Sequence, residues 1–424
     1  MIHLNASFRK IISSSGINFG FRIFGLISTF FATVFISRYF GLATFGSYSL
    51  VFTISQAAAI IFALGLPNTL IKIIGNQNYT IQKAKQLLLK GLKAALLFSI
   101  IPILFFYFGS DFLANEVFHN IELAKYFIVV TIALPLFIAH ELFLYFLIAT
   151  KSFIKYSFFM FVLPNLLLFG FLYLFYLNGN KGYFSFIAFS LAIFVTVIVE
   201  AITVFDWNIR KEKMEFSTRQ LLKTASPLLF SGLLLYLLNW TDILMLGAMV
   251  NETQVGIYNI AYKVGSVGFL VIVSVSTIIT PRMAELFGEG KIKELKKLTH
   301  QSTRLIALLS IPVVLVLIIF NKPILSFFGN EAIAGSNSLV IISVGVLFSA
   351  MVGNVDQILN MTNNHKILRN ITVLCFFVNV ILNFILIPKF GIEGAAIASL
   401  ITNVVINLFC VYYIKKKLGF YTLF

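Results

Sequence analysis

The sequence predicts an all-α integral membrane protein with about twelve transmembrane helices, arranged as two six-helix bundles related by pseudo-two-fold symmetry. Three observations lead to this fold class. The 424-residue chain is 59% apolar and 11% charged, whereas soluble proteins are about 45–50% apolar and about 25% charged. Apolar windows long enough to cross a bilayer, about 20 residues each, recur along the whole chain. Basic residues concentrate in alternate connections between these windows, as in other multi-pass proteins.

The apolar windows predict the helices one by one, and polar or Gly- and Pro-containing stretches separate them. The twelve predicted spans are 13–37, 46–66, 87–108, 123–148, 155–177, 183–205, 223–248, 257–280, 303–320, 333–357, 369–387 and 394–414. The first window is longer than the 7–15 apolar residues of a cleavable signal peptide, so we expect it to be retained as a helix.

The positions of the 32 Lys and Arg residues predict the topology. With both termini in the cytoplasm, 25 of them fall in inner loops and tails, five in outer loops, and two, Arg22 and Lys263, within helices. This distribution obeys the positive-inside rule for a multi-pass protein of the cytoplasmic membrane. The net charge of +16 therefore reflects topology, and no nucleic-acid partner is expected. Cys375 and Cys410 both lie in apolar windows, which favours packing over disulfide or metal-binding roles.

Short matches at a constant offset predict an internal duplication. Gly46 and Tyr48 recur as Gly256 and Tyr258, and the pairs at 101–102 and 187–188 recur at 311–312 and 397–398, always 210 residues apart. Because each half has an even number of spans, both halves enter the membrane from the same side, as parallel repeats do. We therefore expect an N-terminal lobe at 1–205, a cytoplasmic linker at 206–222 and a C-terminal lobe at 223–424.

Polar residues within the predicted helices indicate where a substrate path could lie, since polar groups are costly in hydrocarbon. The first helix carries a stripe spaced by three or four residues: Asn18, Arg22, Gly25, Thr29 and Thr33. Later helices carry similar sets: Asn239 and Asp242; Ser349, Gly353, Asp356 and Asn360; Ser399, Asn403 and Asn407. The stripes predict a hydrated cleft between the lobes or, alternatively, polar contacts that fasten helices together.

The two basic residues within spans suit an anionic substrate. A phosphate or pyrophosphate head group that crosses a low-dielectric barrier needs cations along its path. We expect Arg22 and Lys263 to supply them, with Asn18 and Asn239 as further substrate-binding residues.

The acidic residues within spans suit ion coupling. A buried carboxyl can exchange ions, so transport could be coupled to a H⁺ or Na⁺ gradient. Asp242, Glu141 and Asp356 are the candidates for ion coupling or gating. The alternative is a pair of static salt bridges, Arg22 with Glu141 and Asp242 with Lys263, whose predicted depths match.

Enzymatic motifs do not occur. No GxxxxGK[ST] string is present, and His140-Glu141 does not continue as HExxH because residue 144 is Leu144. The predicted outer loops are all short, which argues against a membrane-embedded polymerase or ligase. We expect no catalytic residues, no metal and no cofactor. His140 is expected to pack, and Glu200 to be structural near the cytoplasmic interface.

Three strings resemble those of a known family: RYFGLATFGSYSLVF (38–52), DILMLGAMVNETQVGIYNIAYKV (242–264) and NVILNFILIPKFGIEGAAIASLITN (379–403). They are similar to bacterial polysaccharide flippases of the Wzx type, in the multidrug/oligosaccharidyl-lipid/polysaccharide exporter superfamily. The resemblance extends over the whole chain in helix count, loop lengths and basic loops. At single positions, Asp242, Gly256, Tyr258 and Lys263 match the family's pattern.

The resemblance implies a MATE-like pair of six-helix bundles in the bacterial inner membrane. It implies alternating access that moves an undecaprenyl-pyrophosphate-linked oligosaccharide, of O-antigen or capsule type, to the outer leaflet. Membrane lipids, a polysaccharide polymerase and a chain-length regulator are the implied partners. The alternatives are an ion-coupled multidrug exporter of the same superfamily, a longer lipid II flippase, a membrane-embedded polymerase or ligase, and a structural scaffold.

Overall fold

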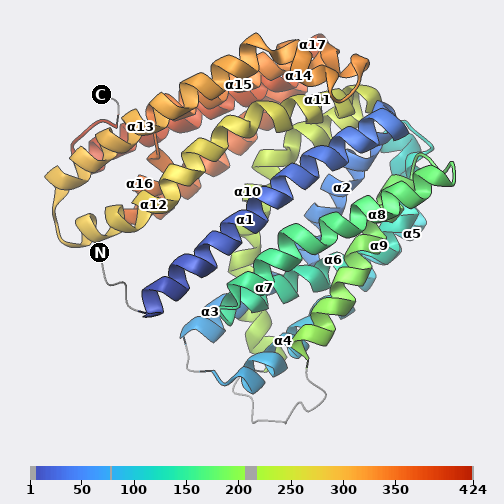
Figure 1. Ribbon diagram of the computed structural model, residues 1–424, viewed down its shortest axis with the longest axis horizontal. Coiled ribbons are helices and arrows are strands. Elements are labelled where there is room, and N and C mark those ends of the chain that lie inside the picture. Colours follow the sequence, from blue (N-terminus) through green and yellow to red (C-terminus); the bar gives the residue numbers. More distant parts are fainter. Residues whose placement is uncertain (1–5, 77–78, 206–216, 423–424) are drawn as a thin grey trace. The chain divides into compact units, whose positions relative to one another are not determined.

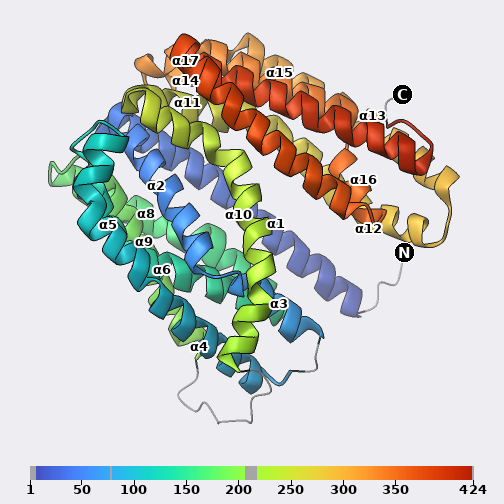
Figure 2. The ribbon, with the colours of Figure 1, turned by 180° about the vertical axis from the view of Figure 1, so that it is seen from behind.

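The computed structural model describes residues 6–76, 79–205 and 217–422, and within these ranges the chain is helical without strands (Figures 1 and 2). The chain divides into two compact units, Met1–Tyr236 (unit 1) and Leu237–Phe424 (unit 2). The boundary falls inside one long helix, α10 (Thr218–Met249). Much of the predicted linker, residues 206–216, lies outside the described residues.

Unit 1 is built around α6, most of whose side chains are apolar and buried. This helix packs against α2, α3, α4, α5 and α9. The helices of unit 1, besides the first part of α10, are α1 (Ala6–Phe35), α2 (Leu42–Phe62), α3 (Leu66–Asn76), α4 (Ile81–Phe98), α5 (Ile100–Phe112), α6 (Leu123–Ala149), α7 (Phe153–Ser157), α8 (Leu163–Leu177) and α9 (Phe184–Val204). Single π-helical turns extend α1, α5 and α7 at their ends.

Unit 2 is built around α15, which packs against α11, α13 and α17. Its helices, besides the end of α10, are α11 (Glu252–Gly265), α12 (Phe269–Gly288), α13 (Ile292–Ile319), α14 (Asn321–Ser326), α15 (Ser336–Val352), α16 (Val355–Met361) and α17 (His365–Leu418). Cys375 and Cys410 are free and fully buried in one apolar cluster of this unit, which confirms their predicted packing role.

Within the described residues, ten helical segments are long and apolar enough to cross a membrane. One of them, α17, is 54 residues long and would measure about 80 Å if straight, far more than the roughly 30 Å of a bilayer core. It breaks at Gly391 (φ 55°, ψ −131°), a left-handed conformation that glycine adopts without a steric penalty. The break separates the predicted spans 369–387 and 394–414. With α17 counted twice and α10 added, the total is the twelve helices that the sequence predicts.

Several connections predicted as loops are helical instead. Residues 66–76 form α3, and α12 and α13 together fill most of the predicted loop 281–302. The α3 segment is only 11 residues long, and charged residues occupy the ends of α12 and α13 that fill the predicted loop, so a search for apolar windows of spanning length cannot see either. The predicted span 333–357 is also interrupted, because Gly353 (φ 84°) ends α15 before α16 begins.

Candidate functional site

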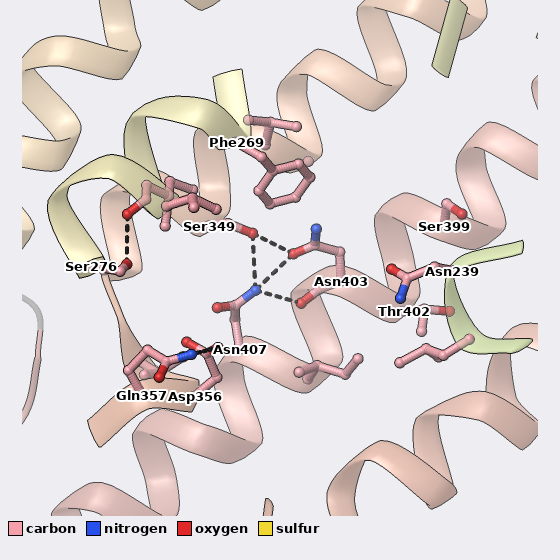
Figure 3. A pocket seen from close by; sticks show the side chains of 18 of the residues that line it. Asn239, Phe269, Ser276, Ser349, Asp356, Gln357, Ser399, Thr402, Asn403 and Asn407 are labelled. Carbon is pink, nitrogen blue, oxygen red and sulfur yellow. Dashed lines mark hydrogen bonds between the residues drawn. The ribbon is translucent and has the colours of Figure 1, made fainter. Parts of the chain in front are cut away.

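Unit 2 contains a cavity of about 740 Å³, here called the unit-2 cavity (Figure 3). Its walls come from α10, α11, α12, α15, α16 and α17. Twelve side chains with amide, hydroxyl or carboxyl groups, apart from the phenol of Tyr262, line it: Asn239, Ser276, Thr277, Thr280, Ser349, Asp356, Gln357, Asn379, Ser399, Thr402, Asn403 and Asn407. Polar residues at this density inside an apolar membrane unit indicate a place for a polar ligand.

Three of these side chains form a hydrogen-bonded triangle (Figure 3). Asn403 and Asn407 are one helical turn apart on α17, so they lie on the same face. The Ser349 hydroxyl of α15 donates to Asn403 Oδ1 at 2.6 Å, and Asn407 Nδ2 donates to the same oxygen at 2.7 Å. This arrangement fixes both amides and leaves Asn403 Nδ2 and Asn407 Oδ1 without a protein partner.

The opposite wall presents hydroxyl oxygens. Ser276, Thr277 and Thr280 of α12 each donate to a carbonyl of their own helix, at 2.6–2.8 Å. Their remaining lone pairs can accept hydrogen bonds. Where α15 breaks, Oδ1 of buried Asn354 lies 2.7 Å from the Ser276 oxygen and is an alternative acceptor for the same hydroxyl proton.

A buried carboxylate lies behind the cavity wall. Asp242 Oδ2 accepts from the Tyr258 hydroxyl at 2.6 Å and from the Ser399 hydroxyl, and its Oδ1 accepts from Asn383 Nδ2 at 2.7 Å. Asn383 also donates to Asn379 at 3.0 Å. Ser399 and Asn379 both line the unit-2 cavity. The carboxylate is therefore connected to the cavity directly through Ser399, and through Asn383 to Asn379.

Of the four predicted site residues of unit 2, two line the cavity and two do not. Asn239 and Asp356 line the cavity. Asp242 does not reach it, and Lys263 is not among the lining residues, although its neighbour Tyr262 is. Hydroxyl and amide groups of Tyr258, Ser399 and Asn383 donate hydrogen bonds to the Asp242 carboxylate. A salt bridge between Asp242 and Lys263 stays a prediction.

The predicted residues of unit 1 lie on α1 and α6. The Arg22 side chain is exposed, and its guanidinium carbon is 5.9 Å from the centre of the Phe161 ring. Gly25 permits this approach, since a side chain there would overlap Phe161. Asn18 is partly buried, and its Oδ1 has no hydrogen-bond partner. No ion pair between Arg22 and Glu141 is present among the described residues of unit 1.

Sequence reasoning missed a buried polar pair in unit 1. His140 Nδ1 of α6 lies 3.0 and 3.1 Å from the two carboxylate oxygens of Glu200 on α9. The Glu200 side chain is 0% exposed, so it is paired with His140 and not hydrated, and His140 is more than a packing residue. The two are 60 residues apart, and no spacing rule connects them; the only signal is that each is an ionisable residue within an apolar helix.

Comparisons with known proteins identify the family and the fold of the chain. The model of the polysaccharide biosynthesis protein family matches residues 7–287, and the MatE model matches residues 227–385. A relative is the probable low-salt glycan biosynthesis flippase Agl15 of Haloferax volcanii, which is 25% identical over 182 residues, 43% of this chain and 39% of that protein. The chain thus spans about two fifths of the length of the curated relatives it matches first.

Two solved structures share the fold over nearly the whole chain. The lipid II flippase MurJ in an inward closed conformation matches with a TM-score of 0.76 and 16% identity, over 95% of this chain and 87% of that one. An inward-facing multidrug resistance MATE family transporter of the MOP superfamily matches with a TM-score of 0.78 and 15% identity, over 93% and 94%. The chain belongs to the polysaccharide biosynthesis protein family and has the all-α fold of MOP-superfamily transporters, as the resemblance predicted.

Proposed function

We propose that the chain flips an undecaprenyl-pyrophosphate-linked oligosaccharide across the cytoplasmic membrane by alternating access, for the biosynthesis of a surface polysaccharide. The unit-2 cavity carries this proposal, because a large space lined by amides and hydroxyls suits a glycan in a protein that is otherwise apolar. The family match and the relative named as a probable glycan flippase support it. We place the protein in a bacterial inner membrane with both termini in the cytoplasm, and expect a polymerase and a chain-length regulator as partners.

Arg22 and Lys263 are proposed to attract the pyrophosphate. Arg22 is exposed on α1, where a guanidinium can make bidentate contacts with phosphate oxygens. Asn18 lies one helical turn away with an unpartnered oxygen, and can accept from a sugar hydroxyl. Asn239 is exposed at the edge of the unit-2 cavity and offers an amide to the glycan.

Asp242 is proposed to couple transport to a H⁺ or Na⁺ gradient. Its Oδ2 accepts two hydrogen bonds, from Tyr258 and Ser399. A proton bound to that oxygen would be a donor itself, so one of the two hydroxyls would have to turn away. Ser399 belongs to the cavity wall, so the ionic state of Asp242 would change the surface that the substrate meets. Glu141 and Asp356 remain proposals for gating.

A multidrug exporter is the second candidate function. Asp356, the carboxylate that lines the cavity, and the similarity to a MATE family transporter favour it. Such a protein would expel organic cations, driven by an imposed ion gradient.

The test is leaflet translocation of an undecaprenyl-pyrophosphate-linked oligosaccharide in proteoliposomes at matched protein levels. We expect the wild type to be active and Arg22→Ala and Lys263→Ala to be strongly impaired. Lys125→Ala, which removes an exposed cation that pairs with Glu122, is the matched control and should transport normally. Asp242→Asn should lose dependence on the ion gradient. A wild type that flips no glycan but expels rhodamine 6G would replace the flippase proposal with the exporter.

A further inference from the structure

We propose that the unit-2 cavity is a subsite for the uncharged sugar rings of the transported glycan, and that it excludes both the pyrophosphate and sugars that carry carboxylates. This inference rests on the proposed flippase function and deepens it, since it states which part of the substrate the cavity holds and which repeat units the protein accepts. The cavity lies wholly within unit 2, so it can be considered without reference to unit 1.

The charge of the lining argues against an anionic ligand. Among the cavity residues that the structure describes there is no Lys, Arg or His, and Asp356 is the single ionisable carboxyl. A phosphate or carboxylate removed from water needs cationic partners or several directed donors to offset its desolvation. Here it would instead meet Asp356 and the oxygens of α12, which repel it. The pyrophosphate therefore has to be held elsewhere.

The hydrogen-bonding groups match sugar hydroxyls. A hydroxyl both donates and accepts, so it is best bound by a donor and an acceptor placed side by side. Asn403 Nδ2 offers a donor and Asn407 Oδ1 an acceptor on the same helical face, because the triangle with Ser349 occupies the other end of each amide (Figure 3). On the facing wall the α12 hydroxyls accept but cannot donate while they bond their own helix, and sugar O–H groups supply the missing protons.

The apolar part of the lining suits the C–H faces of sugar rings. Phe269 and Tyr262 contribute aromatic surface, and Val346, Leu400 and Ile406 contribute aliphatic surface between the polar groups. A cavity of about 740 Å³ lies within the roughly 300–1,000 Å³ of ordinary ligand pockets and is large enough for a few sugar rings.

In the duplication that the sequence predicts, the corresponding helix of unit 1 lacks this polarity. At the 210-residue offset, Asn403 and Asn407 of α17 correspond to Ile193 and Val197 of α9, and Ser399 corresponds to Phe189. The same helix of unit 1 thus fills the equivalent positions with apolar side chains. Amides that served only to fasten helices would have counterparts in both units, whereas a binding surface needs to be present in one.

The experiment compares two synthetic lipid-pyrophosphate substrates in proteoliposomes: one carries a neutral tri-N-acetylchitotriose, and the other a trisaccharide of the same length that ends in glucuronic acid. We expect the wild type to flip the neutral substrate at least tenfold faster. Asn403→Asp keeps the acceptor of the triangle but replaces the free donor with a charged oxygen. It should slow the neutral substrate about tenfold, which corresponds to about 1.4 kcal/mol. Asn370→Asp, the same change at an exposed position of α17, should leave both rates unchanged.

A gain-of-function variant keeps the test independent of folding. Thr277→Lys adds a cation at the exposed edge of the cavity, where the threonine bonds only its own helix. It should raise the rate for the glucuronate substrate towards that of the neutral one. The proposal is overturned if the wild type flips both substrates equally, if Asn403→Asp does not slow the neutral substrate, or if Thr277→Lys does not raise the rate for the glucuronate substrate. A wild type that flips neither substrate refutes the flippase function itself.

Discussion

Replacing His140 with leucine is expected to destabilise unit 1 strongly, because it leaves the Glu200 carboxylate buried without a partner. That side chain is 0% exposed, and His140 Nδ1 is its hydrogen-bonding group in the described structure. Breaking a buried ion pair from one side costs about 3–5 kcal/mol. For a unit of this size each kcal/mol shifts the melting temperature by about 2–4 °C, so the loss is on the order of 10 °C.

The double replacement His140→Leu with Glu200→Met should recover most of this loss. Two apolar side chains of similar volume need no hydrogen bonds, and replacing a whole buried pair is often neutral or stabilising. Glu200→Met alone leaves only the His140 N–H unsatisfied, and should cost about 1–3 kcal/mol. The three variants and the wild type form a double-mutant cycle, whose coupling energy isolates the pair.

The assay measures the melting temperature of the purified chain in detergent. The readout is the loss of the monodisperse size-exclusion peak on heating. His365→Leu makes the same substitution at an exposed histidine at the start of α17 and should melt like the wild type. The reasoning is refuted if His140→Leu melts within about 2 °C of the wild type. It is also refuted if the double variant is less stable than His140→Leu alone.

Three further predictions concern single sites. Tyr258→Phe removes a donor to a buried carboxylate and should lower the free energy of unfolding by about 1–3 kcal/mol. The control, Tyr48→Phe at the corresponding position of the predicted duplication, keeps its stacked aromatic contacts and should melt like the wild type in the same assay. Gly353→Ala should lower stability by at least about 1–3 kcal/mol, since φ is 84° and the new methyl would overlap the Thr303 hydroxyl; Gly91→Ala, with open space in mid-helix, should instead be stabilising by about 0.5–1 kcal/mol. Maleimide should label neither cysteine before unfolding, and labelling of the native protein would contradict their burial.

The sequence predicted the spanning helices well because burial in lipid demands long apolar windows, and such windows are visible without any tertiary information. It could not predict α3, which at 11 residues is shorter than a spanning window, or the charged extensions of α12 and α13, which have no apolar signature. The interruption at Gly353 was equally hidden, because a glycine within an apolar window fits a continuous helix as well as a break.

For the site, the polar stripes of helical spacing contain five residues that line the unit-2 cavity: Ser349, Asp356, Ser399, Asn403 and Asn407. Their functional roles stay predictions. The pairing of residues was harder to predict. Matching depth suggested that Asp242 would meet Lys263, but depth leaves the rotation of each helix undetermined. Tyr258, Asn383 and Ser399 face the carboxylate. The pair of His140 and Glu200 depends on the contact between α6 and α9, which no local pattern encodes.

The duplication separates what the scaffold requires from what function adds. Glu200 of α9 corresponds, 210 residues on, to Cys410 of α17, a fully buried member of an apolar cluster. In the other direction, polar Asn403 and Asn407 of α17 correspond to Ile193 and Val197 of α9. At these positions of the predicted alignment, each unit has apolar residues where the other has polar ones. Because buried polar groups cost stability in a membrane, those present in one unit alone are the residues for which a functional reason has to be sought.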